Sequence, residues 1–81
     1  MDEEKKIQIQ SDTFFRLINH LHDQKELQNI DLMNLAGFCR NCLARWYKES
    51  ADKHGIDITS EEARELIYKM PYSEWKDKYQ K

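Results

Sequence analysis

Turn-forming residues are scarce in this chain, and their scarcity limits the folds open to it. Only two glycines and one proline occur among 81 residues. An all-β domain needs a turn after each short strand, and glycine and proline are the residues that most often make such turns. The sequence therefore predicts an all-α fold, a small compact domain of about four helices with a long central second helix.

Size and charge bear on the partners that such a domain takes. A chain of 81 residues is near the lower end of what one hydrophobic core stabilises alone. We therefore expect a homo-oligomer, most simply a dimer, or binding to another protein. Charged residues make up 35% of the chain, but the net charge is only −2. This near balance argues against nucleic acid and membrane surfaces as partners.

The N-terminus indicates the compartment. Residues 1–6 are mostly charged and lead into no apolar run, so the sequence predicts neither a secretory signal nor a membrane span. The two cysteines are three residues apart and cannot cross-link distant segments. We therefore expect a cytoplasmic protein with reduced thiols.

The first helix is predicted after a flexible lead-in over residues 1–10, and residues 11–81 are predicted to form a single helical domain. Ser11 or Asp12 can act as the N-cap. The apolar residues that follow recur at the spacing of one helix face, and they are Phe14, Leu17, Ile18 and Leu21. This helix is expected to end near Asp23.

The second helix is predicted to be long, because Asp31 offers an N-cap and no residue type clearly stops the pattern before Gly55. Projection at about 100° per residue aligns one apolar stripe, which consists of Leu32, Leu35, Ala36, Cys39, Leu43 and Trp46. Gly37 falls inside this helix, where it costs about 1 kcal/mol relative to alanine. It therefore suggests the close approach of another helix.

Two further helices are predicted in the C-terminal third. Thr59 followed by Glu62 matches a capping box, which predicts a third helix through about Lys69. Pro71 disfavours helical geometry at Met70 and suits the first position of a helix. A short fourth helix is thus expected over residues 72–80.

Cys39 and Cys42 admit three interpretations. Cys39 lies in the apolar stripe, so a small core residue is the simplest. A closed zinc or other transition-metal site needs about four ligands, and the pair would require His20 or donors from a second chain. A redox role needs an activated thiolate at a helix N-terminus. Cys39 is predicted about two turns inside its helix, where that activation is absent.

A second face of the long helix combines amides, an aromatic ring and a cation, which recognise directional partners. We interpret it, with aromatic residues near the C-terminus, as a subunit contact or small-ligand site, against the simpler reading of a solvated face and a core cluster. The predicted partner or ligand face consists of Asn34, Phe38, Asn41, Arg45, Tyr72 and Trp75.

No catalytic group is predicted. The serines lack a nucleophile context and no glycine-rich phosphate loop is present. We therefore expect a non-enzymatic module that self-associates or binds a partner, without a cofactor. The alternative is a metal-binding protein that uses Cys39 and Cys42, with a thiol redox protein less favoured.

Three strings in the chain resemble a family of short bacterial proteins known as domain of unknown function 1244. They are residues 28–43 (QNIDLMNLAGFCRNCL), Trp46-Tyr47 and residues 70–76 (MPYSEWK). The resemblance covers residues 14–80 and implies a small all-α, bacterial, cytoplasmic domain with no established activity, cofactor or catalytic residue. Lys69 departs from the pattern, since glycine is expected before Met70, and this affects only the local turn.

Overall fold

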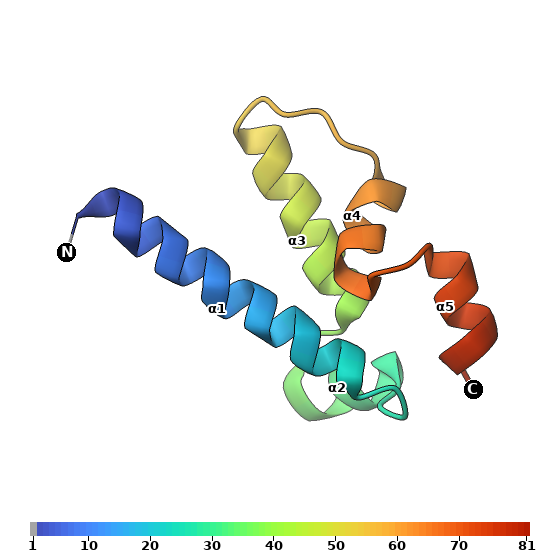
Figure 1. Ribbon diagram of the computed structural model, residues 1–81. Helices are drawn as coiled ribbons and strands as arrows, with labels where there is room; N and C mark the ends of the chain where they lie inside the picture. Colours follow the sequence, from blue (N-terminus) through green and yellow to red (C-terminus); the bar gives the residue numbers. More distant parts are fainter. Residues whose placement is uncertain (1) are drawn as a thin grey trace.

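The computed structural model describes residues 2–81 as helices joined by short loops (Figure 1). Met1, the first residue of the predicted lead-in, lies outside the described residues. Over residues 2–81 there is no strand. The helices are α1 (Glu3–Asp23), α2 (Asn29–Ala36), α3 (Arg40–Lys53), α4 (Ser60–Tyr68) and α5 (Tyr72–Tyr79). The predicted all-α class is confirmed, with five helices in the described residues instead of about four.

Helix α1 begins at Glu3, well before the predicted start at Ser11 or Asp12. Asp2 is its N-cap, and the Asp2 carboxylate accepts a hydrogen bond from the Lys5 backbone N–H at 2.8 Å. Acidic residues in the first turn, Glu3 and Glu4, also suit the positive end of the helix dipole. The lead-in predicted for residues 1–10 is therefore helical from Glu3.

The predicted long second helix is wrong, because the chain turns at Gly37. Gly37 adopts a left-handed conformation (φ 75°) and its N–H donates to the Met33 carbonyl at 3.0 Å, which ends α2. Cys39 is then extended (φ −143°, ψ −179°) and serves as the N-cap of α3. A Cβ added at Gly37 would meet nothing within 4 Å. The glycine is there for its backbone conformation and does not mark a close helix contact.

The break also divides the predicted apolar stripe. Three of its members are buried, namely Leu32, Cys39 and Leu43. The other three are exposed, namely Leu35, Ala36 and Trp46. Leu35 is 84% exposed, and the members of the stripe from Cys39 onward lie beyond the break, so one helical projection no longer relates them to α2.

The capping box before α4 is confirmed. The Thr59 hydroxyl accepts from the Glu62 N–H at 3.0 Å, and the Thr59 N–H donates to the Glu62 carboxylate at 3.3 Å. Helix α4 ends at Lys69, which is left-handed (φ 62°) although it is not glycine. Pro71 then precedes α5 as its N-cap.

The core forms where α3 packs along α4, while α5 and α1 also contact α4. It is built from Ile18, Leu21, Leu32, Cys39, Leu43, Ala44, Ala63 and Ile67. Only the C-terminal half of α1 takes part, and its N-terminal half extends away from the other helices (Figure 1). The molecule therefore measures 44 × 26 × 21 Å. Among residues 2–81, no helix combines the length and the apolarity needed to span a membrane.

Arg40, the first residue of α3, is only 2% exposed and holds the loops together. Its guanidinium donates to the carbonyls of Leu21, Gln24 and Leu27 at 3.3, 3.0 and 2.8 Å, and to the Asn29 side-chain oxygen at 3.1 Å. The first two carbonyls belong to the negative C-terminal end of α1. Burial lowers the pKa of Arg40, but an arginine keeps its charge even so.

Replacement of Arg40 should therefore destabilise the fold strongly. We expect Arg40→Met to lower the free energy of unfolding by about 3 kcal/mol or more, because three backbone carbonyls and the Asn29 side-chain oxygen lose a charged donor. Urea unfolding followed by circular dichroism measures the loss. Arg45→Met on the same helix is the control, since Arg45 is largely exposed and should change stability by less than about 0.5 kcal/mol. Equal losses in both variants would contradict the role of Arg40.

The left-handed Lys69 yields a second expectation. A left-handed residue with a side chain carries a strain of about 1–2 kcal/mol, and glycine removes it at some entropic cost in the unfolded chain. We expect Lys69→Gly to raise the free energy of unfolding by about 0.5–1 kcal/mol. Lys53→Gly, at the last helical residue of α3, should instead lower it. A Lys69→Gly variant less stable than wild type in urea would show that the lysine is not strained.

Candidate functional site

The break at Gly37 places both cysteines in the first turn of α3. Cys39 is the N-cap, and Cys42 follows three residues later. The two Sγ atoms are 3.6 Å apart, and the Cys42 Sγ lies 3.9 Å from the Met33 Sδ on α2. The expectation that Cys39 lies two turns inside a helix is therefore wrong, and the objection it raised to thiol activation no longer holds.

The two thiols differ in exposure. Cys39 is 8% exposed and belongs to the core, as its place in the apolar stripe predicted. Cys42 is only partly buried. The pKa of Cys42 is lowered, chiefly by a hydrogen bond from the backbone of Cys39, and partial burial opposes this effect. The Cys39 side chain and the positive charge of Arg45 lower it further. Cys42 is thus the more accessible of the two thiols, and it is more acidic than an ordinary cysteine.

The predicted metal set is not assembled in the structure. Within residues 2–81, no three side chains of the His, Cys, Asp and Glu types converge as metal ligands would. His20 lies on α1 and does not join Cys39 and Cys42. A closed zinc site at this pair would need two further donors from outside the chain.

The predicted partner face is also divided by the turn. Asn34 is exposed on α2, whereas Asn41 and Arg45 lie on α3, so no single helix face carries all of them. Phe38 lies in the connecting loop, partly buried, and its ring stacks on Trp46 with centroids 6.3 Å apart. Sequence periodicity aligned these residues only because it assumed one continuous helix.

Tertiary packing brings Asn41 together with the aromatic residues of α5. Asn41, Tyr72 and Trp75 line one pocket of about 340 Å³. Trp75 is 3% exposed and lies under the Arg40 guanidinium, 5.0 Å from the ring centre. Its main role is therefore in packing. Tyr72 and Asn41 are partly buried at the edge of this pocket.

A chain of polar side chains runs behind that pocket. Asn29 accepts from Arg40 and donates to the Tyr68 hydroxyl at 3.0 Å, and this hydroxyl donates to Asn41 at 2.7 Å. The network therefore connects the start of α2 with α3 and α4. Among the described residues, no buried side-chain nitrogen or oxygen lacks a hydrogen-bond partner. This arrangement fixes geometry and leaves no buried polar group aimed at a ligand.

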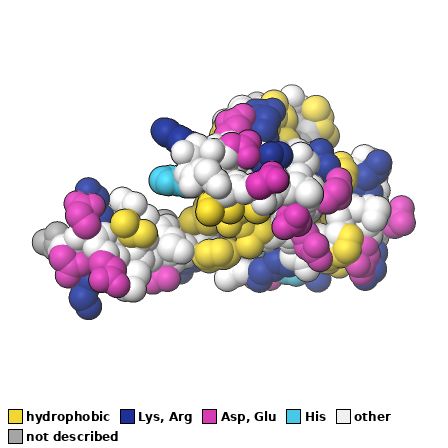
Figure 2. All heavy atoms as spheres, turned by 90° about the horizontal axis from the view of Figure 1, so that it is seen from above, with side chains coloured by type: hydrophobic (Ala, Val, Ile, Leu, Met, Phe, Trp, Pro, Cys, Tyr) yellow, Lys and Arg dark blue, Asp and Glu magenta, His cyan; other side chains and the backbone are white. Residues whose placement is uncertain are grey.

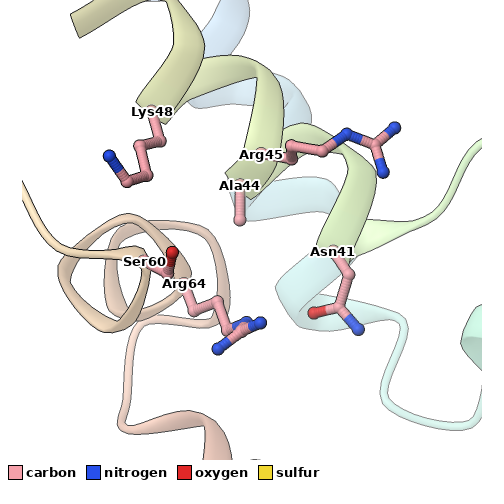
Figure 3. A pocket seen from close by; sticks show the side chains of 6 residues that line it. All are labelled: Asn41, Ala44, Arg45, Lys48, Ser60 and Arg64. Carbon is pink, nitrogen blue, oxygen red and sulfur yellow. The ribbon is translucent and has the colours of Figure 1, made fainter. Parts of the chain in front are cut away.

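A second pocket, of about 280 Å³, lies between α3 and α4 and is lined by three cationic side chains. Figure 3 shows the Arg64 guanidinium extending toward Asn41 and the Lys48 side chain ending on the other side of Ser60, while Arg45 turns away from both. Each cation has a nearby carboxylate, in the pairs Arg45–Glu49 at 3.8 Å, Lys48–Asp52 at 3.3 Å and Arg64–Glu61 at 2.6 Å. These carboxylates offset the positive charge, so the pocket is a weak candidate for an anion.

Two features of the site have little signal in the sequence. Arginine is rarely buried, so nothing in the pattern predicts the role of Arg40 except its place just after Gly37. The contact of the Met33 sulfur with Cys42 also has no local signal, because it forms only when the turn at Gly37 folds α2 back toward α3. Interpreting Gly37 as a helix stop would have predicted the two separate helices on which Met33 and Arg40 lie.

Tyr68 makes the stability of the site depend on pH. Burial raises the pKa of Tyr68, so the folded chain keeps this proton where an unfolded tyrosine, with a pKa of about 10, loses it. The stabilisation is complete below about pH 10 and is lost as the pH rises above it. We expect the urea concentration at the unfolding midpoint to decrease as the pH is raised above about 10. The decrease should be less steep in Tyr68→Phe. Tyr72→Phe controls for general alkaline effects, and identical slopes in both variants would contradict this assignment.

One comparison with known proteins identifies the chain's relatives. The family described as protein of unknown function (DUF1244) matches residues 27–81. That segment contains α2 to α5, both cysteines and Arg40, and it begins after the end of α1. No curated protein matches the chain. Because the family match spans more than half of the sequence, the chain belongs to the DUF1244 family, whose function is unknown.

Proposed function

We propose that this chain acts by self-association, as a symmetric dimer in which the N-terminal half of α1 of each copy packs against the surface of the other copy. The observation that carries the proposal is the N-terminal half of α1. Every residue from Asp2 to Thr13 is exposed, although residues 3–13 are helical. This segment extends past the rest of the molecule (Figure 1), and none of its residues belongs to the hydrophobic core.

A helical segment of this kind needs a partner. Isolated helices shorter than about 12–15 residues are marginal in water, and most helices in proteins owe their stability to the packing of an apolar face. The segment has such a face. At about 100° per residue, Ile7 falls on the same stripe as Phe14, Ile18 and Leu21. The stripe that packs into the core therefore continues beyond it, and Ile7 is left 60% exposed.

The same chain offers an apolar surface beside this stripe. Phe14 stacks on Tyr47 of α3, with ring centroids 6.3 Å apart. Tyr47 in turn lines an open pocket of about 250 Å³ with Ala51, Ile56 and Ile58. Tyr47 is 40% exposed and Ile56 is 58% exposed. Figure 2 shows hydrophobic side chains gathered where the projecting arm meets the rest of the molecule.

A second copy is the occupant that suits both surfaces at once. In a two-fold dimer each protomer presents the same patch. The arm of one copy, residues 2–13, can therefore cover the hollow of the other, which is the pocket lined by Tyr47, Ala51, Ile56 and Ile58, and the reverse. Each chain carries one arm and one hollow, and the pairing leaves neither uncovered. A small core with limited stability of its own also favours association.

Two isoleucines on the arm form a matched pair for testing this dimer. Ile7 lies on the stripe, whereas Ile9 points about 200° away around the helix, and their exposures are 60% and 50%. We expect a wild-type dimer in sedimentation equilibrium at about 1–100 µM. Ile7→Asp should raise its dissociation constant about a hundredfold, because the change enters the interface twice. Ile9→Asp should raise it by less than about threefold.

Hydrogen exchange localises the contact. The backbone amides of residues 6–13 should be protected in the wild-type dimer and exchange fast in Ile7→Asp, since an unpacked arm frays. A wild-type chain that stays monomeric throughout the concentration range would defeat the proposal. So would a dimer that Ile7→Asp and Ile9→Asp weaken equally.

A further inference from the structure

We propose that Cys39 and Cys42 form a reversible dithiol–disulfide pair, which exchanges two electrons with low-molecular-weight disulfides and thiols. The proposal stands on the placement of the two sulfurs. They are 3.6 Å apart at the start of α3, and one is accessible while the other is in the core. This inference is independent of the self-association through α1, because neither cysteine belongs to the arm or the hollow.

Closing the bond requires little movement. A disulfide has an S–S length of about 2.05 Å, so the sulfurs must approach by roughly a further 1.5 Å from their 3.6 Å separation. Cys39 is the N-cap, outside the helical part of the chain, and its extended backbone allows its side chain to turn toward Cys42. Rotation of the two side chains is sufficient, and the hydrogen bonds of α3 are kept.

The surroundings favour a thiolate at Cys42. The first turn of a helix directs N–H groups and the positive end of the dipole toward this position. The first turn of α3 contains no acidic residue, and the positive charge of Arg45 acts on the Cys42 thiol.

Exposure assigns the order of the steps. Cys42 is the partly exposed thiol, so its thiolate attacks one sulfur of an external disulfide; the S–S bond of that disulfide breaks and one external thiolate leaves. The Cys39 thiol then loses its proton to solvent and attacks the Cys42 sulfur. The mixed disulfide breaks and the second external thiolate leaves. The protein is oxidised by two electrons, and the external disulfide is reduced to two thiols.

The direct test uses the full-length wild-type protein and oxidised glutathione. The reduced protein is incubated in buffers of graded ratios of reduced to oxidised glutathione with a chelator, then quenched with acid, alkylated and weighed by mass spectrometry. We expect one transition, from a doubly alkylated chain to an unalkylated chain with an internal disulfide. This product is two hydrogens lighter than the dithiol and is not covalently linked to a second chain. Product with glutathione on both cysteines, a disulfide between two chains, or no reaction at any ratio would overturn the proposal.

Single variants test the roles of the two thiols. Cys39→Ser should accumulate a stable mixed disulfide on Cys42, because no second thiol resolves it. Cys42→Ser should react with glutathione disulfide at least about tenfold more slowly, because Cys39 is buried. Equal rates in the two variants would contradict the assignment. Circular dichroism checks that each variant is folded, and the wild-type titration decides the proposal if one of them is not.

Two control variants separate this pair from general effects. Met33→Leu keeps the volume beside Cys42 and should still form the internal disulfide, since Met33 takes no part in the electron transfer. Ile7→Asp should give the same glutathione transition as wild type, whether or not it dimerises. A transition that disappears with Ile7→Asp would show that the disulfide depends on the association of two chains, and would overturn the intramolecular pair.

Discussion

The buried guanidinium of Arg40 is the interaction on which the arrangement of this small domain depends. A helix ends with carbonyl groups that have no partner within the helix, and a small protein has few side chains with which to satisfy them. Arg40 donates to the carbonyls of Leu21, Gln24 and Leu27 and to Asn29, and its opposite face rests on Trp75. One side chain thereby joins the end of α1, the start of α2, α3 and α5. The rigid planar fork of an arginine permits this, where the single ammonium of a lysine would not.

The turn at Gly37 is what brings Arg40 to that place, and it positions the thiols in the same way. A continuous helix would hold residues 39 to 42 in its middle, with their N–H groups already used by the preceding turn. Because the chain stops at Gly37 and restarts at Arg40, the N–H groups of the new first turn are directed at the Cys39 and Cys42 region. The packing of Arg40 and the placement of the two thiols therefore both result from one backbone conformation.

The two proposals concern opposite ends of the molecule and different physical forces. Self-association rests on apolar area left open by α1, whose outer half is exposed from Asp2 to Thr13. The dithiol rests on local geometry within α3 and on the Asn29–Tyr68–Asn41 network that holds this helix against its neighbours. The family match covers residues 27–81 and so includes the dithiol but not the arm. The proposed dithiol thus lies in the segment shared with the family, and the N-terminal half of α1 lies outside it.

The sequence by itself determined the helical class, the capping box of Thr59 and Glu62 and the end of α3 near Gly55. These features depend on residues close together in the chain, through caps and helix periodicity. It did not determine the break at Gly37, because a glycine within an apolar helical pattern is compatible both with a kink-free helix and with a left-handed stop. Only the tertiary structure decided between them, since the stop is stabilised by contacts of Arg40 with residues 11 to 19 positions away. For the same reason Asn34, Phe38, Asn41 and Arg45 are divided between α2, the loop and α3. Asn41 instead lines a pocket with Tyr72 and Trp75, through packing that no local pattern contains.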